Sequence, residues 1–240
     1  MTERGAAELH RSSTDIAIGP SALTWDGATL TARIREIAVP LPCRLAGTIR
    51  FHPQAMPGQE FALDAAGRHR WQPLAPLARV EVSFARPALA WSGSGYWDAN
   101  WGDEPLESGF LRWDWSRAGL AGGRAAVLYD ATRSDGSART LALRFDRAGA
   151  IAAFEPPPPS PLEPTFWRLA RAIRAEAPAR VEAALEDAPF YARSLLGVRI
   201  LGEDTRAIHE SLSLTRFRSR LVQAMLPVRM PRRTGRSCRA

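Results

Sequence analysis

The sequence predicts an all-β protein with a larger β half over residues 1–154 and a smaller, mostly β half over residues 165–231. Many short segments alternate apolar and polar residues, which is typical of strands that bury one face. Residues that favour turns separate these segments, and no helical stripe lies between them up to residue 154. Strands at this spacing indicate a barrel or a sandwich.

The strands of the first half are predicted from their period of two. The segment 124–145 is predicted to be a hairpin, because Asp135-Gly136 near its centre favours a type I′ turn. The clearest alternating segments are TLTARIREIAV (29–39), ARVEVSFA (78–85), LRWDW (111–115) and RTLALRF (139–145).

A proline-rich stretch, EPPPPSPLEP, marks the predicted domain boundary at residues 155–164. Six of its ten residues are proline, which makes a stiff and extended spacer. The following segment, 165–187, fits a helical stripe and a strand about equally well. Residues 191–217 alternate around a turn predicted at Gly202–Asp204 and indicate a second hairpin.

The composition excludes several classes of protein. No apolar run approaches the roughly 20 residues of a membrane-spanning helix, and the first residues lack the apolar core of a signal peptide. A cytoplasmic location is therefore predicted. The two cysteines, Cys43 and Cys238, have no metal-ligand spacing and do not indicate a disulfide framework.

The net charge of +7 comes entirely from arginine, since all 32 basic residues are Arg. The last residues, 232–240, form a basic tail that either binds an anionic membrane surface or stays solvated without a partner. Nucleic-acid binding is not predicted, because that function needs aromatic residues on a basic face. Here the aromatic residues lie among acids instead.

Residues 91–115 hold five of the eight tryptophans together with five carboxylates. If this stretch is extended, alternation places Tyr96, Asp98 and Asn100 on one face, with Trp97 and Trp101 on the other. Asp is depleted in strands and costly to bury without partners. Asp98 is therefore the carboxylate of this stretch most in need of a functional explanation.

Several interpretations of this stretch remain open from the residues alone. The tryptophans could be core and the acids turn residues, and DANWGD has only part of the spacing of a calcium loop. Two carboxylates in an aromatic cleft would suit a glycosidase. An acid among aromatic rings could instead protonate a carbon–carbon double bond, because the ring faces stabilise a nearby cation.

The stretch GYWDANWGDEPLE (95–107), followed by F-x-R-W-D-W-S-R-A (110–118), resembles the signature of the bacterial carotenoid 1,2-hydratases, or hydroxyneurosporene synthases. The similarity extends over nearly the whole chain. Other stretches that resemble the family are FALDAAGRHRWQPLAPLARVEV (61–82), LEDAPFYARSLL (185–196), LGEDTRAIHESLSL (201–214) and QAMLPVRMPRR (223–233).

The resemblance implies addition of water to the terminal C-1,2 double bond of acyclic carotenoids such as neurosporene or lycopene, with no organic cofactor and no metal. It implies that Asp98, in the Tyr-x-Asp motif, donates the proton. Tyr96 and Trp71, the latter in the Arg-His-x-Trp motif, would stabilise the cation. The implied fold is lipocalin-like, with two β-barrel-like halves. The resemblance implies residues upstream of the position of Met1, so either the start codon is misassigned or the chain lacks N-terminal strands.

Two further expectations concern the acid and the substrate. An acid kept protonated by apolar rings is a weak acid, so a nearby positive charge should stabilise the carboxylate it leaves; Arg68, His69 and Arg70 are the candidates. A carotenoid is too apolar to cross water, so the protein is expected to lie peripherally on the inner membrane. The alternative function is a lipocalin-like isoprenoid-binding protein without catalysis, which would not depend on Asp98.

Overall fold

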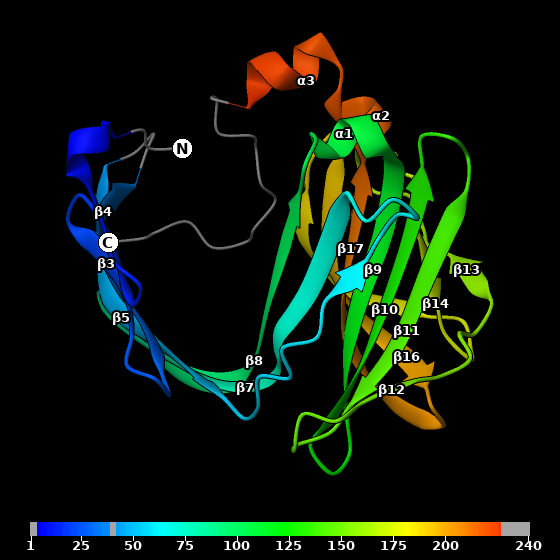
Figure 1. The fold of residues 1–240 in the computed structure, drawn as a ribbon, viewed down its shortest axis with the longest axis horizontal. Helices are drawn as coiled ribbons and strands as arrows, with labels where there is room; N and C mark the ends of the chain where they lie inside the picture. The colour runs from blue at the N-terminus through cyan, green and yellow to red at the C-terminus, as the bar shows by residue number, and fades with distance from the viewer. Residues whose placement is uncertain (1–3, 39–41, 227–240) are drawn as a thin grey trace. The chain divides into compact units, whose positions relative to one another are not determined.

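The computed structural model describes residues 4–38 and 42–226, and these form an all-β protein, as predicted (Figure 1). The described residues divide into two compact units. The first unit comprises residues 4–56 and 75–97, and the second comprises residues 57–74 and 98–226.

The first sheet is antiparallel, with strand order β1-β2-β3-β4-β5-β7-β6 and with β8 paired to β7. Residues 30–38 of the first predicted alternating segment form β4, and the segment 78–85 lies in β7, which confirms both as strands. Residue 39 lies outside the described residues. The strands are β1 (Leu9–Arg11), β2 (Asp15–Ile18), β3 (Ser21–Trp25), β4 (Leu30–Ala38), β5 (Cys43–Pro53), β6 (Phe61–Ala62), β7 (His69–Arg86) and β8 (Ala88–Gly102).

The chain passes between the two units within β7 and β8. In β7 the change of unit falls between Leu74 and Ala75, and Pro73 and Pro76 flank this point. Proline has no N–H to donate to a neighbouring strand, so the ladder is interrupted where the two prolines lie. On either side the pairing differs, since β6 pairs with the start of β7 and β5 pairs with its end.

The second sheet lies wholly in the second unit and has the order β12-β11-β10-β9-β17-β16-β15. Its two outer strands, β12 and β15, are not paired with each other in the described residues, so the sheet is open rather than a closed barrel. The strands are β9 (Phe110–Leu120), β10 (Arg124–Arg133), β11 (Ala138–Phe145), β12 (Ile151–Ala153), β15 (Arg180–Asp187), β16 (Tyr191–Ile200) and β17 (Glu203–Ser213).

Both predicted hairpins are present, but their turns differ from the prediction. In the β10–β11 hairpin only Gly136 has a positive φ, of 84°, so the turn is not type I′, which requires positive φ at two residues. The Asp135 side chain accepts the Ser137 N–H and hydroxyl and shapes a longer loop. In the β16–β17 hairpin the turn is Leu201-Gly202, and β17 already begins at Glu203.

The structure divides the chain differently from the predicted boundary at residues 155–164, because strands from both sides of that stretch share the second sheet. β17 pairs with β9, with Ala207 opposite Ala118. The segment 165–187, which fitted a helix or a strand, contains the strand β15 and no helix. The proline-rich stretch contributes β13 (Pro159–Pro161), which pairs with β14 (Ala172–Arg174).

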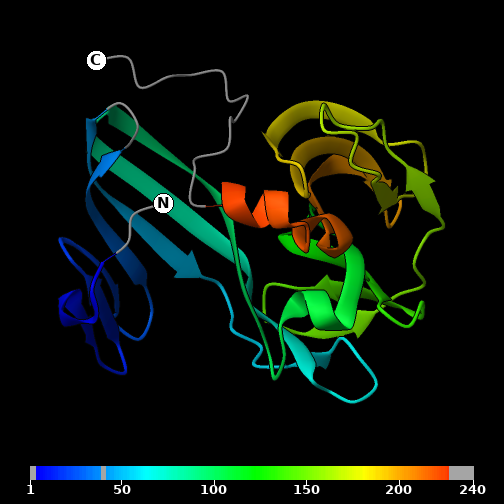
Figure 2. The ribbon, with the colours of Figure 1, turned by 90° about the horizontal axis from the view of Figure 1, so that it is seen from above.

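Four short helices complete the described chain, namely η1 (Ala6–Glu8), α1 (Leu106–Gly109), α2 (Leu214–Phe217) and α3 (Arg220–Met225). In the second unit α1 lies against α2, and α3 follows α2 (Figure 2). None of the helices in residues 4–38 and 42–226 is long and apolar enough to cross a membrane. The predicted basic tail, 232–240, lies outside the described residues.

The core of the second unit lies on one face of its sheet. Leu162 and Ile173, from the β13–β14 region, pack there against residues of β9, β10, β16 and β17. Leu128 of β10 belongs to this core, whereas its neighbour Tyr129 points to the opposite face, as strand alternation requires. The two faces of this sheet therefore carry two different sets of side chains, one of which contains the predicted site.

Candidate active site

Asp98 and Trp71 are brought together in the second unit. The indole Nε1–H of Trp71 donates a hydrogen bond to Asp98 Oδ2, at 2.8 Å between nitrogen and oxygen. Trp71 is completely buried, and Asp98 is half-buried in β8. The two residues are 27 positions apart in the sequence, so the fold creates this pair and no local motif does.

Strand pairing in β7 and side-chain alternation in β8 place these side chains. Trp71 lies opposite Phe61 in the β6–β7 pair, and the two ring centroids are 5.6 Å apart. In β8 the predicted alternation is confirmed at three positions. Asp98 and Asn100 bond aromatic residues of the second unit, whereas Trp97 contacts the aromatic rings of Trp25 and Phe51 in the first unit.

Aromatic rings border the Asp98–Trp71 pair. The ring of Tyr129, in β10, packs edge-on against Trp71 at 5.6 Å, and Trp113, in β9, packs against Tyr129 at 5.9 Å. The hydroxyl of Tyr129 donates to Asn100 Oδ1 at the long distance of 3.5 Å. Burial, and after it the negative charge of Asp98, raises the pKa of the Tyr129 phenol well above its usual value. Tyr129 therefore stays neutral beside Asp98.

Sequence reasoning did not identify Tyr129 as a site residue. The signal that could have found it is the predicted hairpin, because Tyr129 lies on the strand next to Trp113 and Trp115 and is opposite Trp115 in register. Tyr96, the third residue of the predicted trio, is half-buried. It precedes Asp98 by two residues in β8, so alternation projects both side chains from the same face of the strand.

His69 is a buried residue and not a surface one. Its ring packs edge-on against Phe110 at 4.8 Å, and its Nε2 lies 3.2 Å from Glu104 Oε1. A Cβ at Gly109 would lie 2.6 Å from Nε2, and one at Gly102 would lie 2.7 Å from Nδ1. Only glycine fits at these two positions, so the chain around the Trp-rich stretch is shaped to enclose the imidazole.

The expectation that Arg68, His69 and Arg70 stabilise the Asp98 carboxylate is wrong, because other carboxylates hold these residues. Arg68 pairs with Glu104, as His69 does, at 3.3 Å. Arg70 pairs with Glu60 at 3.2 Å. One donor to Asp98 is the neutral indole of Trp71, the residue that follows these three in the sequence.

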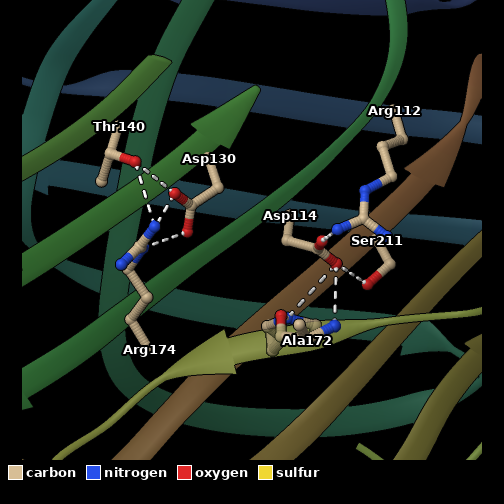
Figure 3. Close-up of polar contacts among 8 residues, drawn as sticks. Arg112, Asp114, Asp130, Thr140, Ala172, Arg174 and Ser211 are labelled. Carbon is tan, nitrogen blue, oxygen red and sulfur yellow. Dashed lines mark hydrogen bonds and ion pairs between the residues drawn. The ribbon is translucent and has the colours of Figure 1, made fainter. Parts of the chain in front are cut away.

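A second polar cluster lies on the other face of the same sheet (Figure 3). Asp114, in β9, is buried; it accepts hydrogen bonds from the Ser211 hydroxyl and, at 3.4 Å, from the Ala172 N–H, with Arg112 at 3.9 Å. Beside it, the guanidinium of Arg174 spans both carboxylate oxygens of Asp130 at 2.8 Å. Burial raises the pKa of the Asp114 carboxyl above its ordinary value.

This cluster contains Ser, His and Asp but does not form a nucleophilic triad. A triad needs the histidine between the hydroxyl and the carboxylate. Here the Ser211 hydroxyl donates to Asp114 directly, and His209 Nε2 donates to the Ala172 carbonyl at 2.8 Å. Burial lowers the pKa of the His209 imidazole to about 4, so the ring is neutral near pH 7. Asp114 and His209 both bond the backbone of Ala172 in β14, and these two hydrogen bonds hold that strand against the sheet.

Among the described residues, no group of three His, Cys, Asp or Glu side chains is placed to hold a metal ion. The arrangement that remains is a carboxyl group hydrogen-bonded to an indole and bordered by aromatic rings. Such a site can hold an apolar molecule against an acid, and the ring faces can stabilise a positive charge that forms on it. The fold and site thus define an all-β protein with an aromatic acid site.

The chain belongs to the carotenoid hydratase CrtC family, whose sequence model matches residues 1–239. It is 51% identical over 238 residues to an acyclic carotenoid 1,2-hydratase of Thiocapsa roseopersicina, and 46% identical over 235 residues to one of Rubrivivax gelatinosus. These alignments cover 98% and 97% of this chain but 58% of each relative. A Rhodobacter capsulatus relative of the same description is 41% identical and is covered to 84%, with 98% of this chain.

A solved Nitrosomonas europaea protein, described as a candidate AttH, has a similar fold. The TM-score is 0.58 at 14% sequence identity, and the match covers 87% of this chain and 72% of that one. At this identity the likeness concerns the fold alone. It agrees with the all-β architecture of the described residues.

Proposed function

We propose that this chain adds water to the terminal C-1,2 double bond of an acyclic carotenoid, of the neurosporene or lycopene type. The observation that carries the proposal is the hydrogen bond from Trp71 to Asp98 within a cluster of aromatic rings. The relatives described as acyclic carotenoid 1,2-hydratases, at 41–51% identity, supply the reaction class.

The proposed reaction begins with Asp98 as the acid. Asp98 gives its proton to C-2 of the double bond, and the π electrons form the new C–H bond and leave a tertiary cation at C-1. The rings of Trp71 and Tyr96 face the cation and stabilise it through their negative quadrupoles. A water molecule then attacks C-1, and its surplus proton returns to the Asp98 carboxylate. The sum is alkene plus water to tertiary alcohol, and the acid is regenerated.

Trp71 also has a part in the acidity of Asp98. The carboxyl group must be protonated before the reaction and must still give up its proton readily. Alkene protonation is favoured when the carboxylate left behind is stabilised. The indole N–H, fixed at 2.8 Å from Oδ2 by a fully buried ring, makes a stronger hydrogen bond to a carboxylate than to the neutral acid.

The substrate itself supports a peripheral membrane location. An acyclic carotenoid is dissolved in lipid, so a protein that acts on it meets it at a membrane surface. The basic tail at residues 232–240 would add attraction to anionic lipid, by about 1 kcal/mol for each arginine near the surface.

The test is product formation in a bacterial host that accumulates neurosporene or lycopene. The chain should convert the pigment to a product heavier by one water, and growth in ¹⁸O-labelled water should label the new hydroxyl. A product heavier by one oxygen atom alone, or an unlabelled hydroxyl, would indicate oxygenation and contradict hydration. Cells with the empty vector provide the baseline, and Asp103→Asn, a change of an exposed acid in the same stretch, should form product like the parent.

A further inference from the structure

A turn at residues 165–169 of the second unit holds two aromatic side chains in solvent. Phe166 is 67% exposed and Trp167 is 36% exposed, and their rings pack edge-on at 5.7 Å. Next to them in sequence, Leu169 is 2% exposed and anchors the turn in the unit. Large aromatic side chains gain most when buried, so a chain that displays two of them together needs a reason.

The turn is held firmly, so the exposure of its rings is not a result of a loose backbone. The Arg168 N–H donates to the Thr165 carbonyl at 2.8 Å, and the Leu169 N–H donates to the Thr165 hydroxyl at 3.2 Å. Arg168 has a φ of 52°, a left-handed conformation that non-glycine residues adopt only when their surroundings impose it. The Phe166 N–H is bonded to the Asp187 carboxylate at 2.9 Å.

Arg216 ties this turn to helix α2. Its guanidinium donates to the carbonyls of Trp167, at 2.7 Å, and Arg168, at 2.8 Å. Helix α3 follows directly, and there Val222 is buried whereas Leu221 is 71% exposed. The turn is thus tied to α2, and α3 lies next to α2 in the second unit (Figure 2). Leu221 adds a third large apolar side chain in solvent.

Exposed arginines accompany the apolar side chains. Arg168, Arg218 and Arg220 are exposed, and within the described residues none of them forms an ion pair. The acids of the adjoining segments are Glu163, Glu186 and Asp187, with Glu107 in helix α1.

We propose that this part of the second unit, defined by Phe166, Trp167 and Leu221 with Arg168, Arg218 and Arg220, docks on an anionic lipid surface. Aromatic rings lie favourably at the boundary between acyl chains and headgroups, and arginine forks bind lipid phosphates. Charge complementarity thus selects a lipid membrane with negative headgroups as the occupant. The inference rests on the proposed function, because it names the surface through which a lipid-dissolved substrate would be reached.

The test is binding to phosphatidylcholine vesicles with and without phosphatidylglycerol. The parent chain should bind the anionic vesicles, and Phe166→Ser/Trp167→Ser should weaken that binding about tenfold or more. The matched control is Leu89→Ser/Trp91→Ser, which changes two apolar residues of β8 that are each 50% exposed. The control should bind like the parent. Arg168→Glu/Arg220→Glu should remove the preference for anionic vesicles.

Several outcomes would overturn the docking surface. They are no vesicle binding by the parent, equal losses in the docking and control variants, or binding lost only when residues 229–240 are deleted. A parent dimer that dissociates in Phe166→Ser/Trp167→Ser would show that the surface joins two copies of the chain instead.

A hydration assay separates this inference from the proposed function. The docking variant should hydrate carotenoid in detergent micelles at the parental rate, and should lose activity only when the substrate is dissolved in vesicles. If the parent hydrates nothing in either medium, the proposed function fails, while the vesicle-binding comparison still decides the docking surface.

Discussion

Asp98 and Asp114 both come from the tryptophan-rich stretch, but the second unit places them in opposite environments. Asp114 is buried between β9 and β14, where a serine hydroxyl and a backbone N–H donate to the same oxygen. Asp98 is half-buried on the other side of the sheet, where an indole donates to it and aromatic rings border the pair. Two similar sequence positions thus give a structural carboxyl group and a candidate catalytic one.

The difference teaches that the partners, and not burial alone, decide what a carboxyl group can do. Asp114 is more buried than Asp98. Its hydrogen bonds come from β14 and β17, from the Ala172 N–H and the Ser211 hydroxyl, and not from an aromatic side chain (Figure 3). Asp98 has a donor that stabilises its carboxylate beside rings that stabilise a cation. Variants on each side of the sheet can sharpen or break this contrast.

The largest expected effect is on stability, on the Asp114 side. The His209 imidazole has a pKa lowered to about 4 by burial, whereas in the unfolded chain its value is near 6.5. As the pH falls from 6.5 to 4, His209 binds a proton in the unfolded chain but stays neutral in the folded protein. The free energy of unfolding should therefore fall by about 3 kcal/mol across this window, and the contribution is fully present above pH 6.5.

The measurement is urea unfolding at a series of pH values, compared with His209→Gln, in which this fall should disappear. Asp114 acts in the opposite direction because its pKa is raised, and it lies 3.9 Å from His209 Nε2, so the difference reports the removal of His209 together with its effect on Asp114. The matched control is His10→Gln, since His10 is exposed. Parallel curves for the parent and His209→Gln would show that the cluster tolerates a charged imidazole.

The next effect is on turnover, on the Asp98 side. Trp71→Phe keeps an aromatic ring but removes the N–H that donates to Asp98. A hydrogen bond to a charged group contributes about 1.5–3 kcal/mol, so turnover per folded molecule should fall roughly 10–100-fold. Circular dichroism verifies folding, and detergent-dissolved lycopene serves as the substrate.

Trp113→Phe provides the control for that variant. Trp113 belongs to the same ring cluster, 5.9 Å from Tyr129, and the substitution is identical. Its turnover should stay within about threefold of the parent, because it removes no hydrogen bond to Asp98. Equal losses in both variants would mean that ring packing matters and the indole N–H does not.

The smallest effect is expected at Tyr129. Tyr129→Phe removes a hydroxyl whose hydrogen bond to Asn100 is long, at 3.5 Å, and keeps the ring that packs against Trp71. The free energy of unfolding should change by less than about 1 kcal/mol, with turnover nearly unchanged. A large loss of turnover at unchanged stability would place the hydroxyl in the chemistry, and would make the site a tyrosine–aspartate pair.

The sequence predicted the local features well and the long-range ones poorly. Alternation correctly placed Asp98 and Asn100 on one face of β8, because side-chain direction in a strand has a period of two. It could not predict that β17 pairs with β9, since no pattern links residues so far apart in the chain. The mixed periodicity of 165–187 did not predict the turn at 165–169 or the strand that follows. The turn is held by hydrogen bonds from residues distant in the sequence, Asp187 and Arg216, which the local pattern does not contain.

The site shows the same limit. The resemblance pointed to Asp98 and Trp71 separately, whereas the hydrogen bond between them comes from the placement of β7 and β8. The arginines before Trp71 were plausible partners of Asp98 by proximity in sequence. Glu104 and Glu60 take them instead, and only the folded chain brings those carboxylates into reach.

The most direct test of the central claim compares Asp98→Asn with Asp114→Asn in one assay of lycopene hydration by purified protein. An amide cannot donate a carboxylic proton, so Asp98→Asn should lower turnover at least about 10³-fold while the melting temperature stays near that of the parent. Asp114→Asn should keep turnover per folded molecule within about tenfold and change stability instead. Substantial hydration by folded Asp98→Asn, or loss of turnover in Asp114→Asn alone, would contradict the account.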